Sequence, residues 1–443
     1  MGDRPRQGAS PGRPAQLGAA TAMNPTTQPE EDREVRSDML TRAAASRPGD
    51  DPIFALHGEA TRRAAAGEDI LNATLGALVD DDGKLCVMPT VFEAFRAVDP
   101  MRGAAYAPIG GDAEFLEAVT ADALGGRASL VGRSVAVATA GGTGALHHTI
   151  VNFLEPGQAL LTTDFFWGPY RTIAEHTGRA VRTFSMFNEE RRFDTAAFEQ
   201  AVHDLLEEQG RVLVVLNSPC HNPTGYSLDP FEWRLVVEAL NRAAKRGPVA
   251  LCVDLAYSRY GAEGSDAWLG AVEGLAPEIP LLAAWSASKS YAQYGARVGA
   301  LVAVVQDPGA RQRVKAAFLH SCRGTWSNCN HAGLLAITSL MAEPEARAVS
   351  DRDRAKLVRL LGERVARFNE LARPAGLDFP RYEGGFFVTV FTAHAARVAE
   401  LCREAGVYLV PLKGGVRIAL CATPEGKVER LVTALSSALE RAE

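Results

Sequence analysis

Short apolar runs alternate with helical stretches through the middle of this chain, and few folds accommodate that alternation. The runs comprise residues 134–138, 159–163, 212–216, 249–254 and 281–284. A run that is apolar at nearly every position is typical of a strand buried on both faces. Strands that alternate with helices build a largely parallel sheet covered by helices. The pattern from about residue 92 to about residue 305 therefore predicts an α/β fold.

The flanking segments predict further elements. A helix is expected over residues 51–66 and a short strand with a turn at 72–76. Another strand is expected at 298–305, followed by a long helical region over about 308–372. The last expected strands, at 386–390 and 416–420, suit a smaller C-terminal domain.

Polar segments follow three of the apolar runs, at the points where the predicted strands end. They are Asn-Pro-Thr-Gly at 222–225, Asp-Leu-Ala-Tyr at 254–257 and Ser-Ala-Ser-Lys at 286–289. In open α/β sheets, ligands bind beyond the carboxyl ends of the strands. The three segments therefore predict one binding site at this edge of the sheet.

The chemistry of the third segment identifies a class of ligand. Lys289 stands beside Ser286 and Ser288, and Arg297 follows eight positions later. A neutral, oriented lysine forms Schiff bases with carbonyl compounds, and serine and arginine are good phosphate ligands. The combination predicts a site for an aldehyde that carries a phosphate, for which pyridoxal 5'-phosphate (PLP) is the obvious candidate. A solvated surface charge is the alternative interpretation of Lys289.

Taken in order, the three segments and the trailing Arg-Val-Gly at 297–299 resemble the class I aminotransferases. These are fold-type I PLP enzymes typified by aspartate and aromatic amino-acid aminotransferases. The resemblance covers roughly residue 51 to the C-terminus. It implies a large domain with a mostly parallel seven-stranded sheet, in which 298–305 is antiparallel, and a smaller α+β domain. We expect a disordered extension at 1–48, the N-terminal part of the small domain at 49–90, the large PLP-binding domain at 91–330 and the C-terminal small domain at 331–443.

The resemblance implies the catalytic groups. Lys289 would bind the cofactor and then move the proton between the substrate and the cofactor, which is general acid–base work. Asp254 would pair with the ring nitrogen and keep it protonated through its opposite charge. Tyr257 and Asn222 would hydrogen-bond the phenolic oxygen. Simpler interpretations are a strand-end cap for Asp254 and a turn residue before Pro223 for Asn222.

Further cofactor contacts follow from the same resemblance. The expected phosphate ligands are Gly142, Thr143, Ser286, Ser288 and Arg297. The glycine-rich segment 140–146 follows a strand and opens a helix, which favours an anion, although plain turn chemistry also explains it. Trp167 would stack on the cofactor ring, or else belong to the core. Tyr106 would reach the phosphate of a neighbouring subunit, which implies a homodimer with shared active sites.

Two arginines and a glycine are expected to bind the substrate. Arg417 resembles the arginine that binds the α-carboxylate bidentately, and Gly76 resembles a backbone contact to the same group. Arg323 resembles a residue that reaches across the dimer to a side-chain carboxylate, or it is a member of a surface ion pair. The resemblance implies a dicarboxylic or aromatic amino acid as donor and 2-oxoglutarate as acceptor.

Two departures from aspartate aminotransferases leave the aspartate specificity open. The run at 217–221 before the Asn-Pro-Thr-Gly segment differs from theirs. Tyr170 stands where they have histidine, beneath the stacking aromatic residue. Neither departure removes a catalytic group.

Composition excludes several other classes of function. The chain has 443 residues, of which 47% are hydrophobic, and a net charge of −6. It has no extended basic block for nucleic acid or a membrane surface, and no apolar run of the roughly 18 to 20 residues that span a bilayer. The first 45 residues lack the apolar core of a signal peptide. Seven irregularly spaced cysteines favour reduced thiols in a cytoplasm. No metal site is expected, because the turn at 80–83 lacks the spacing of a calcium loop.

The sequence therefore predicts a cytoplasmic, homodimeric, PLP-dependent aminotransferase that acts on small molecules. A PLP-dependent lyase, cyclase or oxidase that acts on a specialised amino acid is the alternative, because one fold supports many PLP reactions. A DNA-binding regulator built on the fold is a third hypothesis. The N-terminal segment argues against it, since that segment is short and has no helical periodicity.

Overall fold

The computed structural model describes residues 39–443 apart from residues 48 and 50. The chain divides into two compact units, residues 1–51 and residues 52–443. The described part of the first unit contains helix α2 (Arg42–Ala45), which Thr41 caps through its side chain. Most of the extension expected over residues 1–48 lies outside the described residues. Everything that follows concerns the second unit.

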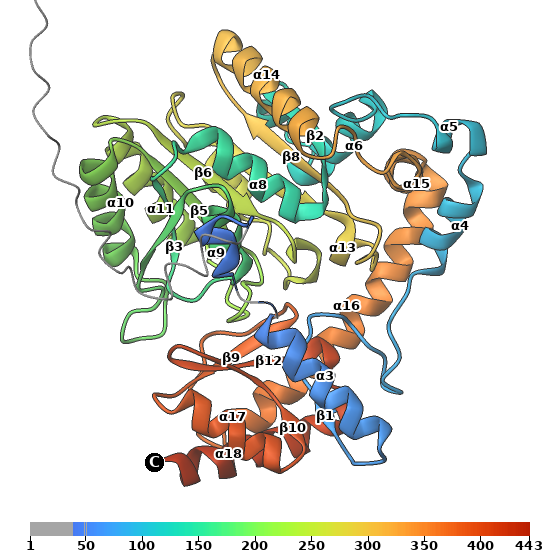
Figure 1. The fold of residues 1–443 in the computed structure, drawn as a ribbon, viewed down its shortest axis with the longest axis vertical. Coiled ribbons are helices and arrows are strands. Elements are labelled where there is room, and N and C mark those ends of the chain that lie inside the picture. The colour runs from blue at the N-terminus through green and yellow to red at the C-terminus, as the bar shows by residue number, and fades with distance from the viewer. Residues whose placement is uncertain (1–38, 48, 50) are drawn as a thin grey trace, which may run out of the picture. The chain divides into compact units, whose positions relative to one another are not determined.

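Seven strands of the second unit form one sheet (Figure 1). They are β2 (Ser134–Ala140), β3 (Ala159–Thr163), β4 (Ala180–Phe184), β5 (Val212–Asn217), β6 (Val249–Asp254), β7 (Leu281–Ser286) and β8 (Val298–Val304). Their order across the sheet is β2-β8-β7-β6-β5-β3-β4. Strand β8 is antiparallel to both of its neighbours, and the other pairs are parallel. This confirms the predicted α/β fold, with its mostly parallel seven-stranded sheet and its antiparallel strand.

Helices cover both faces of this sheet. Those between residues 89 and 342 are α4 (Pro89–Ala97), α5 (Pro100–Ala104), α6 (Ala113–Ala123), α7 (Ala128–Val131), α8 (Gly141–Phe153), α9 (Pro169–His176), α10 (Thr195–Gln209), α11 (Pro230–Ala244), α12 (Trp268–Val272), α13 (Ala287–Ser290), α14 (Pro308–Thr325) and α15 (His331–Ala342). Successive side chains of β5 show the two faces. Val214 belongs to an apolar cluster with side chains of α10 and α11, and Val215 belongs to another with side chains of α8 and α14. Burial on both faces explains why the strands are apolar at nearly every position.

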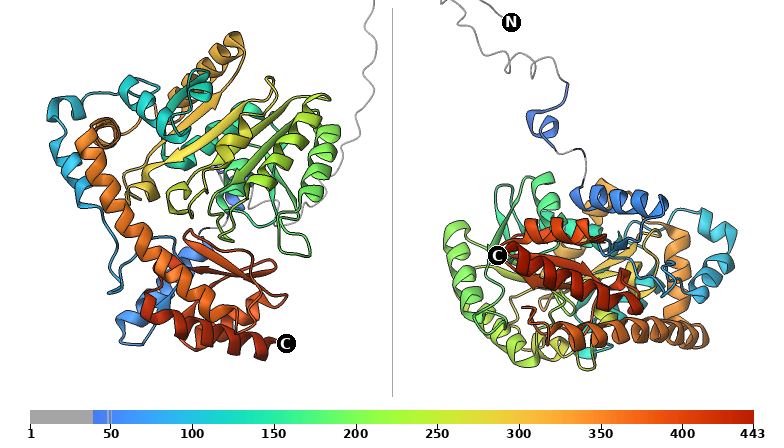
Figure 2. Two further views of the ribbon diagram at one scale, coloured as in Figure 1. Left: turned by 180° about the vertical axis from the view of Figure 1, so that it is seen from behind. Right: turned by 90° about the horizontal axis from the view of Figure 1, so that it is seen from below.

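The remaining strands form two small sheets. They are β1 (Leu71–Asn72), β9 (Phe387–Phe391), β10 (Val407–Tyr408), β11 (Val410–Leu412) and β12 (Gly415–Ala419). Strands β11, β12 and β9 form an antiparallel sheet in that order, and β1 pairs with β10 in parallel. The accompanying helices are α3 (Pro52–Ala65), α16 (Pro344–Ala372), α17 (Ala395–Glu404) and α18 (Val428–Ala442). The long helix α16 packs against α4 and α15 near one end and against α18 near the other (Figures 1 and 2).

Most elements lie where the sequence predicted them, with exceptions. The helix expected at 51–66 is α3, and the helical region expected at 308–372 is three helices, α14, α15 and α16. Strands β4, β10 and β11 were not predicted. The domain boundaries expected at residues 48, 90 and 330 stay a prediction. Of the helices that the structure describes, none combines the length and the apolarity that crossing a bilayer requires.

Candidate active site

Lys289 lies just beyond the carboxyl end of β7, in the short helix α13. Ser286 caps this helix, because its Oγ accepts a hydrogen bond of 3.1 Å from the backbone N–H of Ser288. The Nζ atom of Lys289 lies 5.2 Å from the centre of the Tyr257 ring. Burial lowers the pKa of Lys289, although the charge of Asp254 opposes this. A lysine with a lowered pKa has more of the neutral amine that attacks a carbonyl carbon.

Asp254 is the last residue of β6 and is only 4% exposed. Its Oδ2 accepts a hydrogen bond of 2.7 Å from the hydroxyl of Tyr170, and its Oδ1 accepts one of 3.1 Å from the backbone N–H of Ala256. Burial raises the pKa of Asp254, whereas these two hydrogen bonds and the charge of Lys289 lower it. The buried carboxylate therefore has two hydrogen-bond donors that stabilise its ionised form, and an ionised carboxylate pairs with a cation.

The side-chain amide of Asn217, the last residue of the neighbouring strand β5, links that strand end to Asp254. The Nδ2 of Asn217 donates to the backbone oxygen of Asp254 at 2.9 Å, and its Oδ1 accepts from the backbone N–H of Asn222 at 2.7 Å. The side chain of Asn222 in turn donates to the hydroxyl of Tyr257 at 3.4 Å. The Oδ1 of Asn222 is buried without a hydrogen-bond partner among the described residues. Burial also raises the pKa of Tyr257, so its hydroxyl stays a hydrogen-bond donor.

The beginning of α8 comes close to β7 and to Arg297. A methyl group added to Gly141, whose φ is +68°, would lie 2.4 Å from Nη2 of Arg297. One added to Gly142 would lie 3.4 Å from Cβ of Ser286. The Nη1 of Arg297 donates to Oγ of Ser288 at 3.1 Å. Backbone N–H groups at a helix start, two hydroxyls and a guanidinium thus converge, which is the composition of a phosphate site.

Three other predicted cofactor contacts differ in their surroundings. Thr143 is exposed on the first turn of α8. Trp167 is partly buried, and its ring meets that of Tyr170 edge to face, with centroids 5.7 Å apart and planes at 89°. Tyr106 is 90% exposed. Thr143 and Trp167 therefore adjoin the groups described above, whereas Tyr106 points its ring into solvent in the single chain.

The predicted substrate contacts meet around Phe387. Arg417, on β12, is 6% exposed, and its Nη2 donates to the backbone oxygen of Thr74 at 2.6 Å. Its guanidinium carbon lies 4.6 Å from the centre of the Phe387 ring. A methyl group added to Gly76 would lie 2.4 Å from Cζ of the same ring. The structure therefore brings Arg417 and Gly76 together.

Arg323 does not join these contacts. It lies near the end of α14, it is exposed, and its guanidinium donates to the hydroxyl of Ser327. The indole of the next aromatic residue, Trp326, stacks on His148, with ring centroids 4.5 Å apart and planes at 18°. This packing fixes the end of α14 against α8.

Four residues of the site received no role from the sequence. Asn217 joins two strand ends, Thr74 holds Arg417, and the Phe387 ring lies against both Arg417 and Gly76. Tyr170 was noted only as a departure. A signal existed for Asn217, because a polar residue that ends an apolar run before a turn commonly binds backbone groups. No local pattern marks Thr74 or Phe387, because the contacts of Thr74 with Arg417 and of Phe387 with Gly76 join segments more than 300 residues apart.

The groups around Lys289 fit PLP. That compound presents an aldehyde, a phosphate, a basic ring nitrogen and a phenolic oxygen. The site has a suitable group for each of them. The amine of Lys289 suits the aldehyde, and the groups around Arg297 and Gly141 suit the phosphate. The buried carboxylate of Asp254 suits the ring nitrogen, and the donors of Asn222 and Tyr257 suit the phenolic oxygen. The unpartnered Oδ1 of Asn222 and the close approach of Arg297 to Gly141 also indicate a site built for a ligand.

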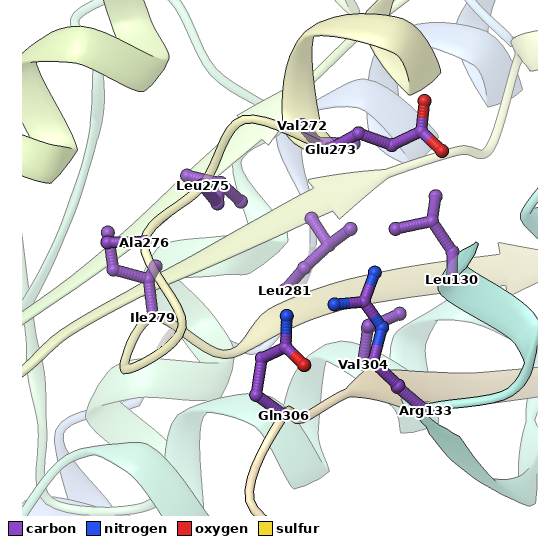
Figure 3. A pocket seen from close by; sticks show the side chains of 10 residues that line it. All are labelled: Leu130, Arg133, Val272, Glu273, Leu275, Ala276, Ile279, Leu281, Val304 and Gln306. Carbon is purple, nitrogen blue, oxygen red and sulfur yellow. The ribbon is translucent and has the colours of Figure 1, made fainter.

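A separate hollow lies at the other end of the same strands (Figure 3). Leu281 and Val304 line its floor, and Arg133 and Gln306 lie at its rim. Leu281 begins β7, whereas Ser286 ends it, so the hollow lies roughly 17 Å along the strand from the lysine. It therefore does not belong to the candidate active site.

Comparisons with known proteins agree with this geometry. The family model for aminotransferases of class I and II matches residues 68–435. The aspartate aminotransferase of Pseudomonas aeruginosa is 28% identical over 404 residues, which cover 88% of this chain and 97% of that protein. The aromatic-amino-acid aminotransferase of Paracoccus denitrificans is 28% identical over 394 residues, which cover 87% and 96%.

Solved structures agree as well. An aminotransferase from Anaerococcus prevotii superposes with a TM-score of 0.85 and 30% identity, over 91% of this chain and 99% of that one. An aromatic-amino-acid aminotransferase from Burkholderia pseudomallei, covalently bound to pyridoxal phosphate, gives a TM-score of 0.75 and 25% identity over 90% and 100%.

Proposed function

The chain belongs to the aminotransferases of class I and II, and on that basis we propose roles for its site residues. It is a fold-type I, PLP-dependent enzyme that moves an amino group between an amino acid and a 2-oxo acid. Lys289 is the proposed covalent attachment point of PLP. The observation that carries this assignment is the position of Lys289, in α13 directly after β7, with its Nζ 5.2 Å from the centre of the Tyr257 ring; the lowered pKa of the amine agrees with it.

We propose protein contacts for the ring nitrogen, the phenolic oxygen, the phosphate and the ring face of PLP. When bound, PLP withdraws electrons from the substrate through its protonated ring. Asp254 holds the proton on the ring nitrogen by its opposite charge, and Asn222 and Tyr257 donate to the phenolic oxygen. The proposed phosphate ligands are Gly142, Thr143, Ser286, Ser288 and Arg297. Trp167 is proposed to cover one face of the ring.

Proton transfer and substrate binding involve a second set of residues. Once the substrate amine has taken the place of Lys289 on the cofactor, the Nζ of Lys289 would take the proton from the substrate α-carbon. The same Nζ would then deliver that proton to the cofactor. Arg417 donates to the backbone oxygen of Thr74, and its buried guanidinium is proposed to bind the α-carboxylate, because a forked guanidinium matches a carboxylate. Gly76 is proposed to approach that carboxylate through its backbone, and the buried Phe387 ring helps to exclude water.

We propose a dicarboxylic or aromatic L-amino acid as the amino donor and 2-oxoglutarate as the acceptor. Relatives named for aspartate and for aromatic amino acids support both donor classes. The exposed guanidinium of Arg323 supports the dicarboxylic class, because an exposed side chain at the end of α14 is free to enter another subunit's site.

A cytoplasmic homodimer with shared active sites is the proposed form of the enzyme. Tyr106 is 90% exposed although it is a large aromatic residue, which supports a contact with a second subunit. All seven cysteines lie among the described residues and are free thiols, which supports a reducing compartment.

We also propose the domain division 49–90 with 331–443 as the small domain and 91–330 as the large one. Its support is that the early strand β1 pairs with the late strand β10. The backbone N–H of Ala419 also donates to the oxygen of Ala73.

One experiment tests the proposed substrates. The visible absorption band of the purified holoenzyme would be recorded before and after separate addition of L-glutamate, L-aspartate and L-phenylalanine. Loss of the band with release of the matching 2-oxo acid identifies the donor class. If none of the three removes the band, the proposed donors are wrong, and a specialised amino acid or a lyase, cyclase or oxidase reaction takes their place.

A further inference from the structure

Tyr170 is a buried tyrosine that contacts the site without a role in the proposed function. It lies on α9, at 1% exposure, and its hydroxyl donates to Oδ2 of Asp254 at 2.7 Å. The carboxylate's other oxygen is bound only by the backbone N–H of Ala256 among the described residues. Tyr170 is therefore the side chain that supplies this carboxylate with a hydrogen bond.

Burial makes this hydrogen bond matter for the charge of Asp254. Taking the carboxylate out of water raises the pKa of Asp254. The hydrogen bond from Tyr170 is the largest of the effects that lower this pKa again. A hydrogen bond to a buried charged group stabilises that charge strongly, because a buried anion without its donor retains its full desolvation cost. Removal of the hydroxyl therefore shifts Asp254 towards its neutral form.

Tyr170 itself stays neutral. Burial and the adjacent carboxylate raise its pKa well above the ordinary value for tyrosine. The other ionisable groups near the carboxylate are Cys252, Tyr257 and Lys289. Burial raises the pKa of the first two as well, so neither ionises near neutral pH. Near neutral pH the donor to Asp254 is therefore the neutral hydroxyl of Tyr170.

The ring of Tyr170 makes a second contact with the site. It meets Trp167 edge to face at 5.7 Å and stacks on Phe166 with centroids 6.3 Å apart and planes at 12°. One side chain therefore contacts both the residue proposed to bind the ring nitrogen and the residue proposed to stack on the ring. A Tyr170→Phe change keeps the ring contacts and removes only the hydrogen bond.

We propose that Tyr170 is a positioning residue that keeps the Asp254 carboxylate ionised and oriented through the hydrogen bond from its hydroxyl. This inference rests on the proposed pairing of Asp254 with the ring nitrogen of PLP. It distinguishes the chain from a protein with histidine at this position, because a histidine donor titrates between about pH 5 and 8.

The test measures the dissociation constant of PLP from the full-length apoprotein, over the range from about pH 9 to about pH 6. Tryptophan fluorescence or the absorbance of bound PLP reports binding without any measurement of turnover. For each variant the ratio of its dissociation constant to that of the wild type is plotted against pH. The ratio removes the titration of PLP itself, which both proteins share.

Tyr170→Phe is expected to raise this ratio as the pH falls, to about tenfold near the acid end. The reason is that a fraction of Asp254 becomes protonated before PLP binds. Tyr170→His is expected to show the opposite slope, because an imidazole that gains a proton strengthens its bond to the carboxylate. If the Tyr170→Phe variant does not fold, the slope of the ratio for Tyr170→His against pH is the test.

Tyr226→Phe is the matched control. The hydroxyl of Tyr226 donates to the buried carboxylate of Glu232 at 2.6 Å, so the same atom is lost from the same kind of pair outside the cofactor contacts. It is expected to lower the melting temperature and to leave the ratio independent of pH. A Tyr170→Phe ratio that is flat with pH, like that of the control, overturns the inference.

Asp254→Asn separates this inference from the proposed function. If that variant binds PLP as the wild type does, the proposed pairing of Asp254 with PLP fails, and the inference about Tyr170 falls with it. If Asp254→Asn weakens binding and Tyr170→Phe does not, only the inference about Tyr170 is wrong.

Discussion

The candidate active site has two halves that are assembled in different ways. The cofactor half surrounds Lys289, Asp254 and Arg297, and the substrate half surrounds Arg417, Gly76 and Phe387. In the cofactor half, several contacts join residues fewer than ten positions apart, as when Ser286 binds Ser288, Arg297 binds Ser288 and Asn217 binds Asn222. The contact from Tyr170 to Asp254 spans 84 residues. In the substrate half, Arg417 is held by Thr74, 343 residues away. The first half is set by how strands end, and the second by how distant segments pack.

This difference predicts how the two halves respond to change. Loops at the ends of a fixed sheet keep their geometry, because each strand end is anchored by the strands beside it. The contacts of Arg417 depend instead on the position of the segment around Thr74 against β12. We therefore expect changes in the first half to alter cofactor binding or chemistry, and changes in the second to alter the KM for the amino acid.

The largest effect is expected for Lys289→Ala. Without the amine, neither covalent binding of PLP nor proton transfer at the substrate α-carbon has a group to perform it. Turnover should fall by more than about a thousandfold, since a positioned acid–base group contributes about 10² to 10⁴. The measurement is the rate of 2-oxo acid formation with saturating PLP.

Lys84→Ala is the control for this loss. Lys84 is a lysine whose side chain is 78% exposed, so its removal deletes the same charge outside the site. It should leave the rate unchanged. Normal turnover by a well-folded Lys289→Ala protein would remove Lys289 from the mechanism and leave the cofactor half without its central residue.

Arg417→Lys is expected to lower kcat/KM by about a hundredfold, with the affinity for PLP unchanged. A lysine keeps the charge but cannot bind Thr74 and a carboxylate with a forked geometry. Both constants are measured on the same preparation, PLP affinity by titration and kcat/KM with the donor amino acid. Arg397→Lys, at an exposed arginine paired with Glu400, is the matched control and should change neither. A loss of PLP affinity equal to the loss of kcat/KM would contradict the separation of the two halves.

The cofactor half could be predicted from the sequence because its residues occupy strand ends. Apolar runs mark the strands, and the residue after each run must lie at the sheet edge, so the positions of Asp254 and Lys289 follow from local pattern. The resemblance to a known family supplied the roles. The sheet itself was predictable for the same reason, since strands buried on both faces are continuous apolar runs.

The substrate half could be predicted only through resemblance. Arg417 lies in a short apolar strand whose pattern does not say what it faces, and Thr74 and Phe387 have no local mark of function. Strand β4 was missed because most of its residues are exposed and Arg182 and Thr183 interrupt its apolar residues, and β10 and β11 because they are only two and three residues long. Tertiary packing determines such elements, and local sequence does not encode it.

Gly76→Ala tests the packing of the substrate half directly. The added methyl group would lie 2.4 Å from Cζ of Phe387, whose ring is 2% exposed and lies 4.6 Å from the Arg417 guanidinium. The contact is too short to persist, and a shift of the buried Phe387 ring presses it against its neighbours. The KM for the amino acid should rise by about tenfold while the affinity for PLP stays the same. Gly362→Ala is the control, because a methyl group there would have no atom within 4 Å. An unchanged KM would mean that Phe387 does not transmit the change to Arg417.

The smallest effect is expected for Asn72→Ala, which acts on Arg417 only through Thr74. The Oδ1 of Asn72 accepts from the hydroxyl of Thr74 at 2.6 Å, and its Nδ2 contacts Nδ1 of His57 at 3.0 Å. Loss of the amide leaves the Thr74 hydroxyl with only its 3.5 Å contact to Nδ1 of His57, and the bond from Arg417 to the Thr74 backbone stays in place. The KM should rise by about two- to fivefold, because one neutral hydrogen bond contributes about 0.5–1.5 kcal/mol.

The matched control is Asn241→Ala, which also removes two hydrogen bonds from a partly buried asparagine, to Gly274 and Ala276. It should lower the melting temperature by a similar amount and leave the KM unchanged. If both variants change the KM alike, the effect is one of general stability, and the position of Arg417 does not depend on the segment that contains Asn72. If only Asn72→Ala changes it, the substrate half extends from β12 through Thr74 to helix α3.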